Sequence, residues 1–279
     1  MNIINNRGES VVFDLSKLQK SLKNSGAEAN LAQAVIQKIQ PKIKEGTTTN
    51  ILYKLAFDEL KNLSKSTAAR YSLKRALVEL GPAGFYFEQW ISRVFQDLGY
   101  QTETGKIIRG HAVKHEADVI AKKDEKTYWI ECKFRNTDDT KISVTTPMYV
   151  LSRIKDISGI SYNLFGTKTE FTDGWLITNA YFTADSIAFG NYYHLRMLSW
   201  DYPEKWSIKT LVDDNNLYPI TCLTTITDKE KQTLLAQSCI LVTDLLKNPQ
   251  ILESISMISE KKQEVIEEAN ALTHQKISE

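Results

Sequence analysis

Apolar residues recur along the first 80 residues at the spacing of amphipathic helices. Leu15, Leu18 and Leu22 fall near one helical face, and Asp14 stands where its carboxylate can cap the free amides of the first turn. A short strand is expected at 10–14, just before this helix. Further helices are expected at about 29–44, 50–63 and 68–80. The pattern predicts a small, mostly helical N-terminal unit.

The stretch "GPAG" at 81–84 interrupts this pattern, because Gly and Pro break regular structure. Helices are then expected at 85–98, from Thr146-Pro147 onward and at 183–193. Strands are expected near 106–109, 117–121, 127–134, 174–179 and 195–200. Strands that alternate with helices predict an α/β fold with a mixed sheet and helices on its faces.

From about Pro219 the spacing is helical again, and Thr227 and Ser259 are placed to cap two of the helices. The chain of 279 residues is long enough for two or three domains at roughly 100–200 residues each. We therefore predict three domains, namely 1–80, 81–215 and 216–279.

Charge distinguishes the first of these segments from the other two. It carries 13 lysines and arginines against 7 aspartates and glutamates, whereas the whole chain has a net charge of only +1. A basic module on a nearly neutral body suits a ligand that bears phosphate, although an excess of lysine on a solvated helical surface gives the same count.

Several classes of protein are not expected from the composition. No apolar run approaches the ~18 residues of a membrane span, and the first residues lack the features of a signal peptide. The three cysteines, at 132, 222 and 239, are too dispersed for a disulfide framework or a zinc site. We expect a cytoplasmic protein without a membrane partner.

Charged residues at the ends of two apolar runs, in "HEADVIAKKDEKTYWIECKF" (115–134), are the candidate chemistry. If Lys123–Lys126 forms the loop of a hairpin, Asp118 lies opposite Glu131. Two neighbouring carboxylates repel each other unless a cation lies between them, and Mg²⁺ prefers such oxygen ligands. Lys133, on the same face as Glu131, is suited to orient or deprotonate water and to neutralise charge on a phosphate.

The alternative is an exposed strand edge, on which Glu131 and Lys133 would form solvent-screened ion pairs. Alternation places Cys132 on the opposite face, where packing in the core is expected in place of nucleophilic chemistry. Trp129 is expected to brace the sheet. His111 and His115 stand just upstream of this hairpin. We expect them to be exposed or to face DNA, in preference to binding a metal.

The order of these residues resembles the PD-(D/E)xK superfamily, and the runs "GFYFEQWISRVFQDLGYQTET", "ADVIA", "YWIECKF" and "GWLITNAYFTADSIAFG" resemble its Mrr-type restriction endonuclease domain. The resemblance covers about 81–205 and implies a restriction endonuclease-like mixed sheet. By position, it implies that Asp118, Glu131 and the Cys132 carbonyl bind Mg²⁺ or Mn²⁺. Lys133 would serve the water or the scissile phosphate, and Glu88 would support the site. The full Glu131 is closer to the Holliday-junction-resolvase branch, which leaves the preferred DNA structure open.

The N-terminal segments "VVFDLSKLQKSLKNSGA", "GTTTNILYKLAFDEL" and "AARYSLKRAL" resemble the ATP-cone, a regulatory nucleotide-binding domain. The resemblance implies ATP or dATP as an effector. The residues expected to bind the nucleotide are Arg7, Lys17, Lys20, Thr49 and Tyr53. Tight-binding members usually carry Lys-Arg where this chain has Asn5-Asn6. The alternative is a degenerate cone that serves oligomerisation or holds DNA.

The tail, "TDKEKQTLLAQSCILVTDLLKN" and the residues after it, resembles a helix-hairpin-helix unit. Such hairpins contact the DNA backbone through a glycine, and Ser238-Cys239 takes its place here. The tail is also acidic, with 9 acidic against 6 basic residues over 216–279. A bundle of helices that packs or forms a dimer is the alternative.

Taken together, these features predict a Mg²⁺-dependent DNA endonuclease of the Mrr-like restriction or defence type. It would act as a homodimer or higher homo-oligomer, because one such site cuts one strand. The alternatives are a structure-specific repair nuclease and a catalytically inactive regulator that binds DNA or nucleotide. Intact Asp118, Glu131 and Lys133 speak against the inactive form, because an unused site gains nothing from buried like charges.

Overall fold

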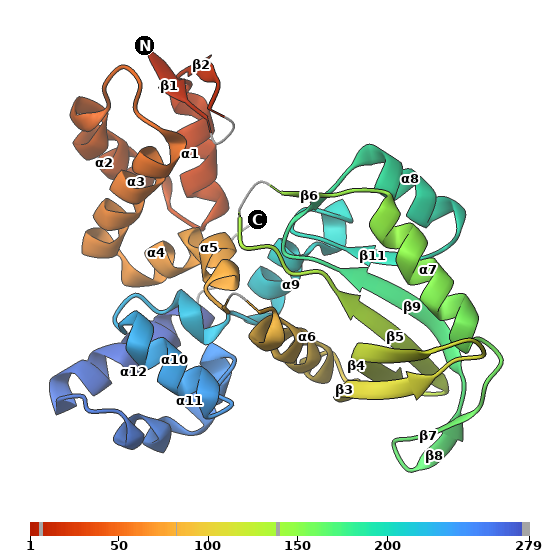
Figure 1. Ribbon diagram of the computed structural model, residues 1–279. Coiled ribbons are helices and arrows are strands. Elements are labelled where there is room, and N and C mark those ends of the chain that lie inside the picture. Colours follow the sequence, from red (N-terminus) through yellow and green to blue (C-terminus); the bar gives the residue numbers. More distant parts are fainter. Residues whose placement is uncertain (6–7, 82, 138–139, 275–279) are drawn as a thin grey trace. The chain divides into compact units, whose positions relative to one another are not determined.

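The computed structural model describes residues 1–5, 8–81, 83–137 and 140–274 (Figure 1). These residues form two compact units, and each is described by itself. One unit combines 1–76 with 220–279, and the other spans 77–219. The division into three domains stays a prediction, while the packing groups the first and third of those segments in a single unit.

The unit of residues 77–219 is built on a five-stranded sheet with the order β11-β9-β5-β4-β3 (Figure 1). Its strands are β3 (Gln101–Arg109), β4 (Lys114–Lys123), β5 (Lys126–Cys132), β9 (Phe171–Ile177) and β11 (Arg196–Leu198). The first three pair in antiparallel fashion, whereas β5, β9 and β11 run parallel to one another. The predicted α/β fold with a mixed sheet is confirmed.

Helices cover the sheet as the alternation of elements predicted. The helix α6 (Phe85–Asp97) packs against β3 and β4, and α7 (Thr145–Ile157) packs against β9 and against α8 (Ala184–Tyr192). Close approach of α7 to the sheet depends on Gly174 in β9, because a Cβ there would lie 2.1 Å from the Ile154 side chain. A side chain at this position would displace Ile154, so the glycine favours close packing of α7 on β9.

The rest of this unit consists of short elements: the parallel pair β6 (Lys141–Ile142) and β10 (Tyr181–Phe182), the hairpin β7 (Tyr162–Leu164) and β8 (Thr167–Thr169), the 3₁₀ turn η2 (Glu204–Trp206), and α9 (Ile208–Asn215). Two apolar clusters meet on the α7 side of the sheet, and Ile154 packs against both.

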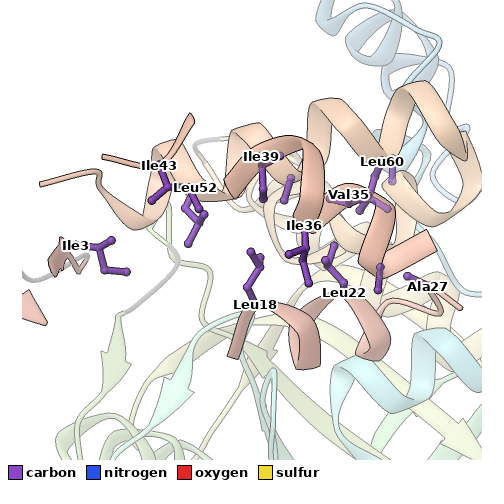
Figure 2. Packing of buried hydrophobic residues seen from close by; sticks show 13 residues of the cluster. Ile3, Leu18, Leu22, Ala27, Val35, Ile36, Ile39, Ile43, Leu52 and Leu60 are labelled. Carbon is purple, nitrogen blue, oxygen red and sulfur yellow. The ribbon is translucent and has the colours of Figure 1, made fainter. Parts of the chain in front are cut away.

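The N-terminal part of the other unit is a hairpin followed by helices: β1 (Asn2–Ile4), β2 (Ser10–Val12), α1 (Leu15–Asn24), α2 (Ala29–Ile39), η1 (Gln40–Lys42), α3 (Thr49–Leu63), α4 (Lys65–Tyr71) and α5 (Leu73–Val78). The spacing predicted the helices and the strand at 10–12, whereas the pairing of that strand with β1 was not predicted. Leu18, Leu22, Val35 and Ile39 are among the residues of its core (Figure 2). Asp14 accepts a hydrogen bond from the Ser16 amide and caps α1, as expected.

The C-terminal elements of the same unit are η3 (Ile220–Cys222), α10 (Asp228–Ala236), α11 (Val242–Lys247), η4 (Pro249–Ser254) and α12 (Ser259–His274). Thr227 and Glu230 form the capping box of α10. The α12 helix packs against α4, and the buried Arg70 guanidinium donates to the Leu272 carbonyl at 2.9 Å. The two ends of the sequence thus pack together in one unit.

Some predicted helix limits are wrong. The helix expected at 29–44 ends at Ile39, because Pro41 cannot continue it and a 3₁₀ turn follows. The helix expected at 68–80 is two helices that meet at Ser72. Ser259 is the first residue of α12, and α7 begins at Thr145 with Pro147 still in its first turn. Among the described residues, none of the helices has the length and apolar character needed to cross a membrane.

Candidate active site

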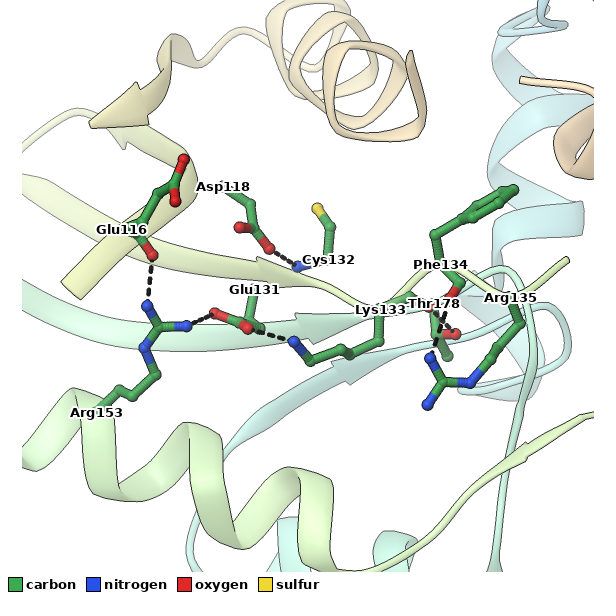
Figure 3. Close-up of polar contacts among 9 residues, drawn as sticks. All are labelled: Glu116, Asp118, Glu131, Cys132, Lys133, Phe134, Arg135, Arg153 and Thr178. Atoms are coloured by element: carbon green, nitrogen blue, oxygen red, sulfur yellow. Dashed lines mark hydrogen bonds and ion pairs between the residues drawn. The ribbon is translucent and has the colours of Figure 1, made fainter. Parts of the chain in front are cut away.

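The register of the β4–β5 hairpin brings the predicted acids together. Lys123 pairs with Lys126 and Val119 with Ile130, so one further step along both strands brings Asp118 opposite Glu131. The Asp118 carboxylate accepts a hydrogen bond of 2.7 Å from the backbone amide of Cys132 (Figure 3). This bond ties the middle of β4 to the end of β5, and the predicted loop and pairing are confirmed.

The two faces of β5 differ as alternation predicted. The Trp129 ring lies on the α7 side, 5.0 Å from the Arg153 guanidinium carbon, and is fully buried, so it braces the sheet. Phe134 packs against Phe87 of α6 on the other side. Cys132 shares the α6 side, and burial, followed by the charge of Asp118, raises the pKa of its thiol well above the ordinary value. The protonated thiol is a packing group and not a nucleophile.

Glu131 is the most deeply buried acid of the site, with 1% of its surface exposed. Its two carboxylate oxygens each receive a cation at 2.6 Å: Oε1 from Lys133 and Oε2 from Arg153 (Figure 3). An ion pair in this environment is not the exposed strand-edge pair that the sequence left as an alternative. The two cationic partners hold the orientation of this buried carboxylate.

Arg153 is a site residue that the sequence analysis missed. Its second guanidinium nitrogen donates to the Glu116 carbonyl at 2.6 Å, and Tyr149 lies 5.3 Å away on its exposed side. An available signal was its spacing, because Arg153 falls between Val150 and Ile157 on the buried face of α7. An arginine on the apolar face of a helix needs a buried partner, and Glu131 is that partner.

Burial and mutual repulsion perturb the acids beside Glu131. Burial, and next the charge of Glu131, raises the pKa of Asp118 to about 6. Glu88, in the first turn of α6, has a pKa raised to about 7 by burial and then by Asp118, Glu116 and Glu131. Glu88, Asp118 and Glu131 are partly or fully buried and Glu116 beside them is exposed, and these four acids outnumber the two nearby cations, Lys133 and Arg153.

Gly84 allows Glu88 to take this position. As the residue that caps α6 it has a φ of +79°, and a Cβ there would lie 3.4 Å from the Phe134 side chain and 3.8 Å from a Glu88 oxygen. Only glycine adopts this backbone region without cost. Gly84, expected only as part of a domain boundary, therefore also fixes the start of α6 and with it the position of Glu88.

The donors at this end of the hairpin fit a hard divalent cation. Asp118, Glu131 and the Cys132 carbonyl offer oxygen atoms, and the raised pKa of Asp118 marks negative charge that a cation would relieve. No group of three or more His, Cys, Asp or Glu side chains suited to a metal occurs within the described ranges. Two carboxylates with a carbonyl and water molecules suit Mg²⁺, which usually keeps several waters.

The histidines upstream do not belong to this site. His115 bonds through Nε2 to Asp156 at 2.7 Å, and Asp156 also accepts from the Ala112 and Val113 amides. His111 bonds to the Ser158 carbonyl at 3.1 Å. These contacts fasten the β3–β4 loop to the end of α7, which is a structural role.

The predicted nucleotide residues lie on the helices of the N-terminal segment. Lys17 and Lys20 are exposed on α1, and Thr49 is the first residue of α3. The Tyr53 ring stacks on Tyr71, with centroids 5.1 Å apart. Ile4 forms a β-bridge with Thr48, so the opening strand lies beside the start of α3. Arg7 and Asn6 lie outside the described residues, and the nucleotide site stays a prediction.

Comparison with known proteins bears on two parts of the chain. Residues 82–202 match the model of a restriction endonuclease family, the Mrr catalytic domain, and residues 218–273 match the domain described as AF1548-like, C-terminal. An uncharacterized protein of Archaeoglobus fulgidus is 31% identical over 181 residues, which cover 64% of this chain and 97% of the archaeal protein.

A solved structure is similar to the same extent. The crystal structure of the protein of unknown function AF1548 matches with a TM-score of 0.54 and 28% identity, over 68% of this chain and 97% of that chain. The restriction endonuclease match includes Glu88, Asp118, Glu131 and Lys133. In the tail the matching family is the AF1548-like C-terminal domain, and the helix-hairpin-helix resemblance stays a prediction.

Proposed function

Since the chain belongs to the AF1548-like family and carries a restriction endonuclease domain at 82–202, we propose that it is a metal-dependent DNA endonuclease of the Mrr-like type. One observation carries the proposal. Asp118 and Glu131 meet at the end of the β4–β5 hairpin, and Lys133 lies 2.6 Å from Glu131. Two acids and a lysine in this order form a site for phosphodiester hydrolysis.

Each residue has a part in the proposed reaction. Asp118, Glu131 and the Cys132 carbonyl would hold Mg²⁺ or Mn²⁺, which supplies charge stabilisation for the phosphate and an activated water. Lys133 orients the attacking water or faces the scissile phosphate. The water oxygen loses a proton to solvent as it bonds to phosphorus, the bond from phosphorus to the leaving oxygen breaks, and that oxygen takes up a proton from solvent. Glu88 exchanges a proton near neutral pH and supports the acids from α6.

The preferred DNA is proposed to be foreign or modified duplex, in a restriction or antiviral role in the cytoplasm. A structure-specific nuclease for four-way junctions is the alternative, and the full glutamate at 131 favours it. Cutting both strands needs two sites, so we propose a homodimer or a higher homo-oligomer.

We further propose that the N-terminal segment binds ATP or dATP as an effector. Lys17 and Lys20 on α1 would face the phosphates, while Thr49 and Tyr53 on α3 would contact the nucleotide. The basic surplus of residues 1–80 and the position of Thr49 at a helix N-terminus support this proposal. Equilibrium binding of labelled ATP to wild type and to Lys17→Gln tests it, and equal binding by both would contradict it.

Cleavage of defined DNA tests the nuclease. Wild type and the near-isosteric Glu131→Gln variant are incubated with methylated plasmid, unmethylated plasmid and a four-way junction, in Mg²⁺, Mn²⁺ or EDTA and with or without ATP. Metal-dependent cutting by wild type alone supports the proposal, and the substrate that is cut selects the restriction or the junction role. Absence of cutting under every condition, with folded protein, rejects it.

A further inference from the structure

The chain that follows β5 stays tied to the segment after β9, whose side chains hold the backbone of Lys133 and Arg135. The β5–β9 ladder ends at Cys132 and Ile177. Beyond it the Lys133 amide donates to the Ile177 carbonyl at 2.8 Å, and the Lys133 carbonyl accepts from the Thr178 hydroxyl at 2.5 Å (Figure 3). The backbone of Lys133 is thus fixed on both sides.

Asn179 repeats this arrangement two residues further on, at Arg135. Its Oδ1 accepts from the Arg135 amide and its Nδ2 donates to the Arg135 carbonyl, both at 2.8 Å. A single buried side chain, 3% exposed, thereby replaces the strand partner that Arg135 lacks. Fixing the backbone in this way holds Arg135 in line with Lys133 and Glu131.

Within the described residues, no carboxylate neutralises the charge of the Arg135 side chain. Its guanidinium donates to the Phe134 carbonyl at 3.1 Å, and no carboxylate in the described part of the chain pairs with it. Arg135 is half-buried, and its side chain leaves the strand on the same side as that of Lys133 (Figure 3). Alternate residues of a strand lie about 6.6 Å apart. This spacing brings the guanidinium beside, and not into, the cluster of acids.

We propose that Arg135 binds a DNA phosphate next to the scissile one, with Asn179 as its positioning residue. The inference rests on the proposed nuclease function and adds a binding subsite to it. An arginine fork matches a phosphate in geometry and charge, and a backbone held at both its amide and its carbonyl keeps the fork aimed. The contact gives affinity and register along the strand, and it does not read sequence.

Salt dependence of DNA binding tests Arg135. Fluorescence anisotropy with labelled duplexes in EDTA measures affinity between low and moderate KCl without cleavage. Arg135→Gln is expected to reduce the slope of log K against log salt by about 0.9, equally for unrelated sequences. Arg135→Lys keeps the slope and shows that charge is the cause. Lys126→Gln, at the opposite end of β5, removes one charge and is expected to leave the slope unchanged.

A double-mutant cycle tests Asn179. Asn179→Ala is expected to weaken binding about 3–10-fold in the wild-type background and to have no further effect in Arg135→Gln. A purely structural asparagine would cost the same in both backgrounds. If folded Arg135→Gln shows the same salt dependence of binding as wild type, and wild type cleaves DNA, this inference is overturned and the proposed function stands. Wild type that neither binds nor cuts DNA overturns the proposed function as well.

Discussion

The guanidinium of Arg153 lies 2.6 Å from the Glu131 carboxylate, although the two residues are 22 positions apart and belong to a helix and a strand. The pair is buried, and the same guanidinium also donates to the Glu116 carbonyl. Through this side chain α7 holds β4 at Glu116 to the end of β5 at Glu131, beside the proposed chemistry.

Removal of Arg153 is expected to be costly. Arg153→Met keeps the length of the side chain but leaves Glu131 with Lys133 alone, and breaking a buried pair costs about 3 kcal/mol of unfolding free energy. Urea unfolding followed by tryptophan fluorescence measures it. The control is Arg196→Met, which breaks a pair of equal length with Asp173 whose arginine is 44% exposed. There a loss of about 1 kcal/mol or less is expected. Equal losses would show that burial of the Arg153 pair does not matter.

Lys133 is expected to matter for catalysis more than for folding. Lys133→Met should lower the rate of plasmid nicking by about 10²–10⁴-fold, because it removes the group that serves the water and the phosphate. Thermal unfolding of this variant should stay close to that of wild type, since Arg153 still holds Glu131. Lys126→Met, at the start of β5, is the control. If Lys133→Met nicks plasmid at the wild-type rate, Lys133 has no role in the mechanism.

Stability of the metal-free protein should fall as the pH rises from about 4.5 to 7. The pKa of Glu88 is about 7 in the folded state against 4.5 ordinarily, so the folded protein binds a proton that the unfolded chain has released. Asp118 acts in the same direction, with a pKa of about 6. Each group contributes at most about 1.4 kcal/mol per pH unit, and less because of its partial exposure.

The melting temperature of wild type and of Glu88→Gln, in EDTA across this pH range, measures the effect. The glutamine has no proton to lose, so the variant should show the shallower decline toward pH 7. A decline as steep as that of wild type would mean that Glu88 does not carry the excess proton.

Divalent metal is expected to stabilise the protein through the two acids of the hairpin. At Mg²⁺ concentrations of about 100 times Kd the gain is about 2.7 kcal/mol, which raises the melting temperature by several degrees. Asp118→Asn and Glu131→Gln should lose this gain, whereas Asp173→Asn, whose carboxylate pairs with Arg196, should keep it. An equal rise in all four proteins would place the metal elsewhere.

Glu268 of α12 is expected to stabilise the fold of the unit to which it belongs. Its carboxylate accepts four hydrogen bonds, from the amides and hydroxyls of Thr224 and Thr225, at 2.6–2.9 Å. Glu268→Gln puts a donor where acceptors are needed and is expected to cost about 2 kcal/mol of unfolding free energy. The neighbouring, less buried Glu267→Gln should cost little. Similar values for the two would show that this network contributes nothing.

The sequence alone determined the class of fold and the proposed chemistry. Alternation along 117–134 predicted a hairpin, and with Lys123–Lys126 as its loop a period of two places Asp118 across from Glu131. The same local rules located α6 with Glu88, the capping of α1 and α10, and the packing role of Cys132.

Tertiary structure alone decided which groups surround those acids. Arg153 reaches Glu131 because Gly174 lets α7 approach the sheet, and Asn179 holds Arg135 because two parallel segments continue side by side beyond their ladder. Packing likewise joined the first and last helices in one unit. Such contacts join residues far apart in the chain, and periodicity reports only which face a residue occupies and not which partner meets it there.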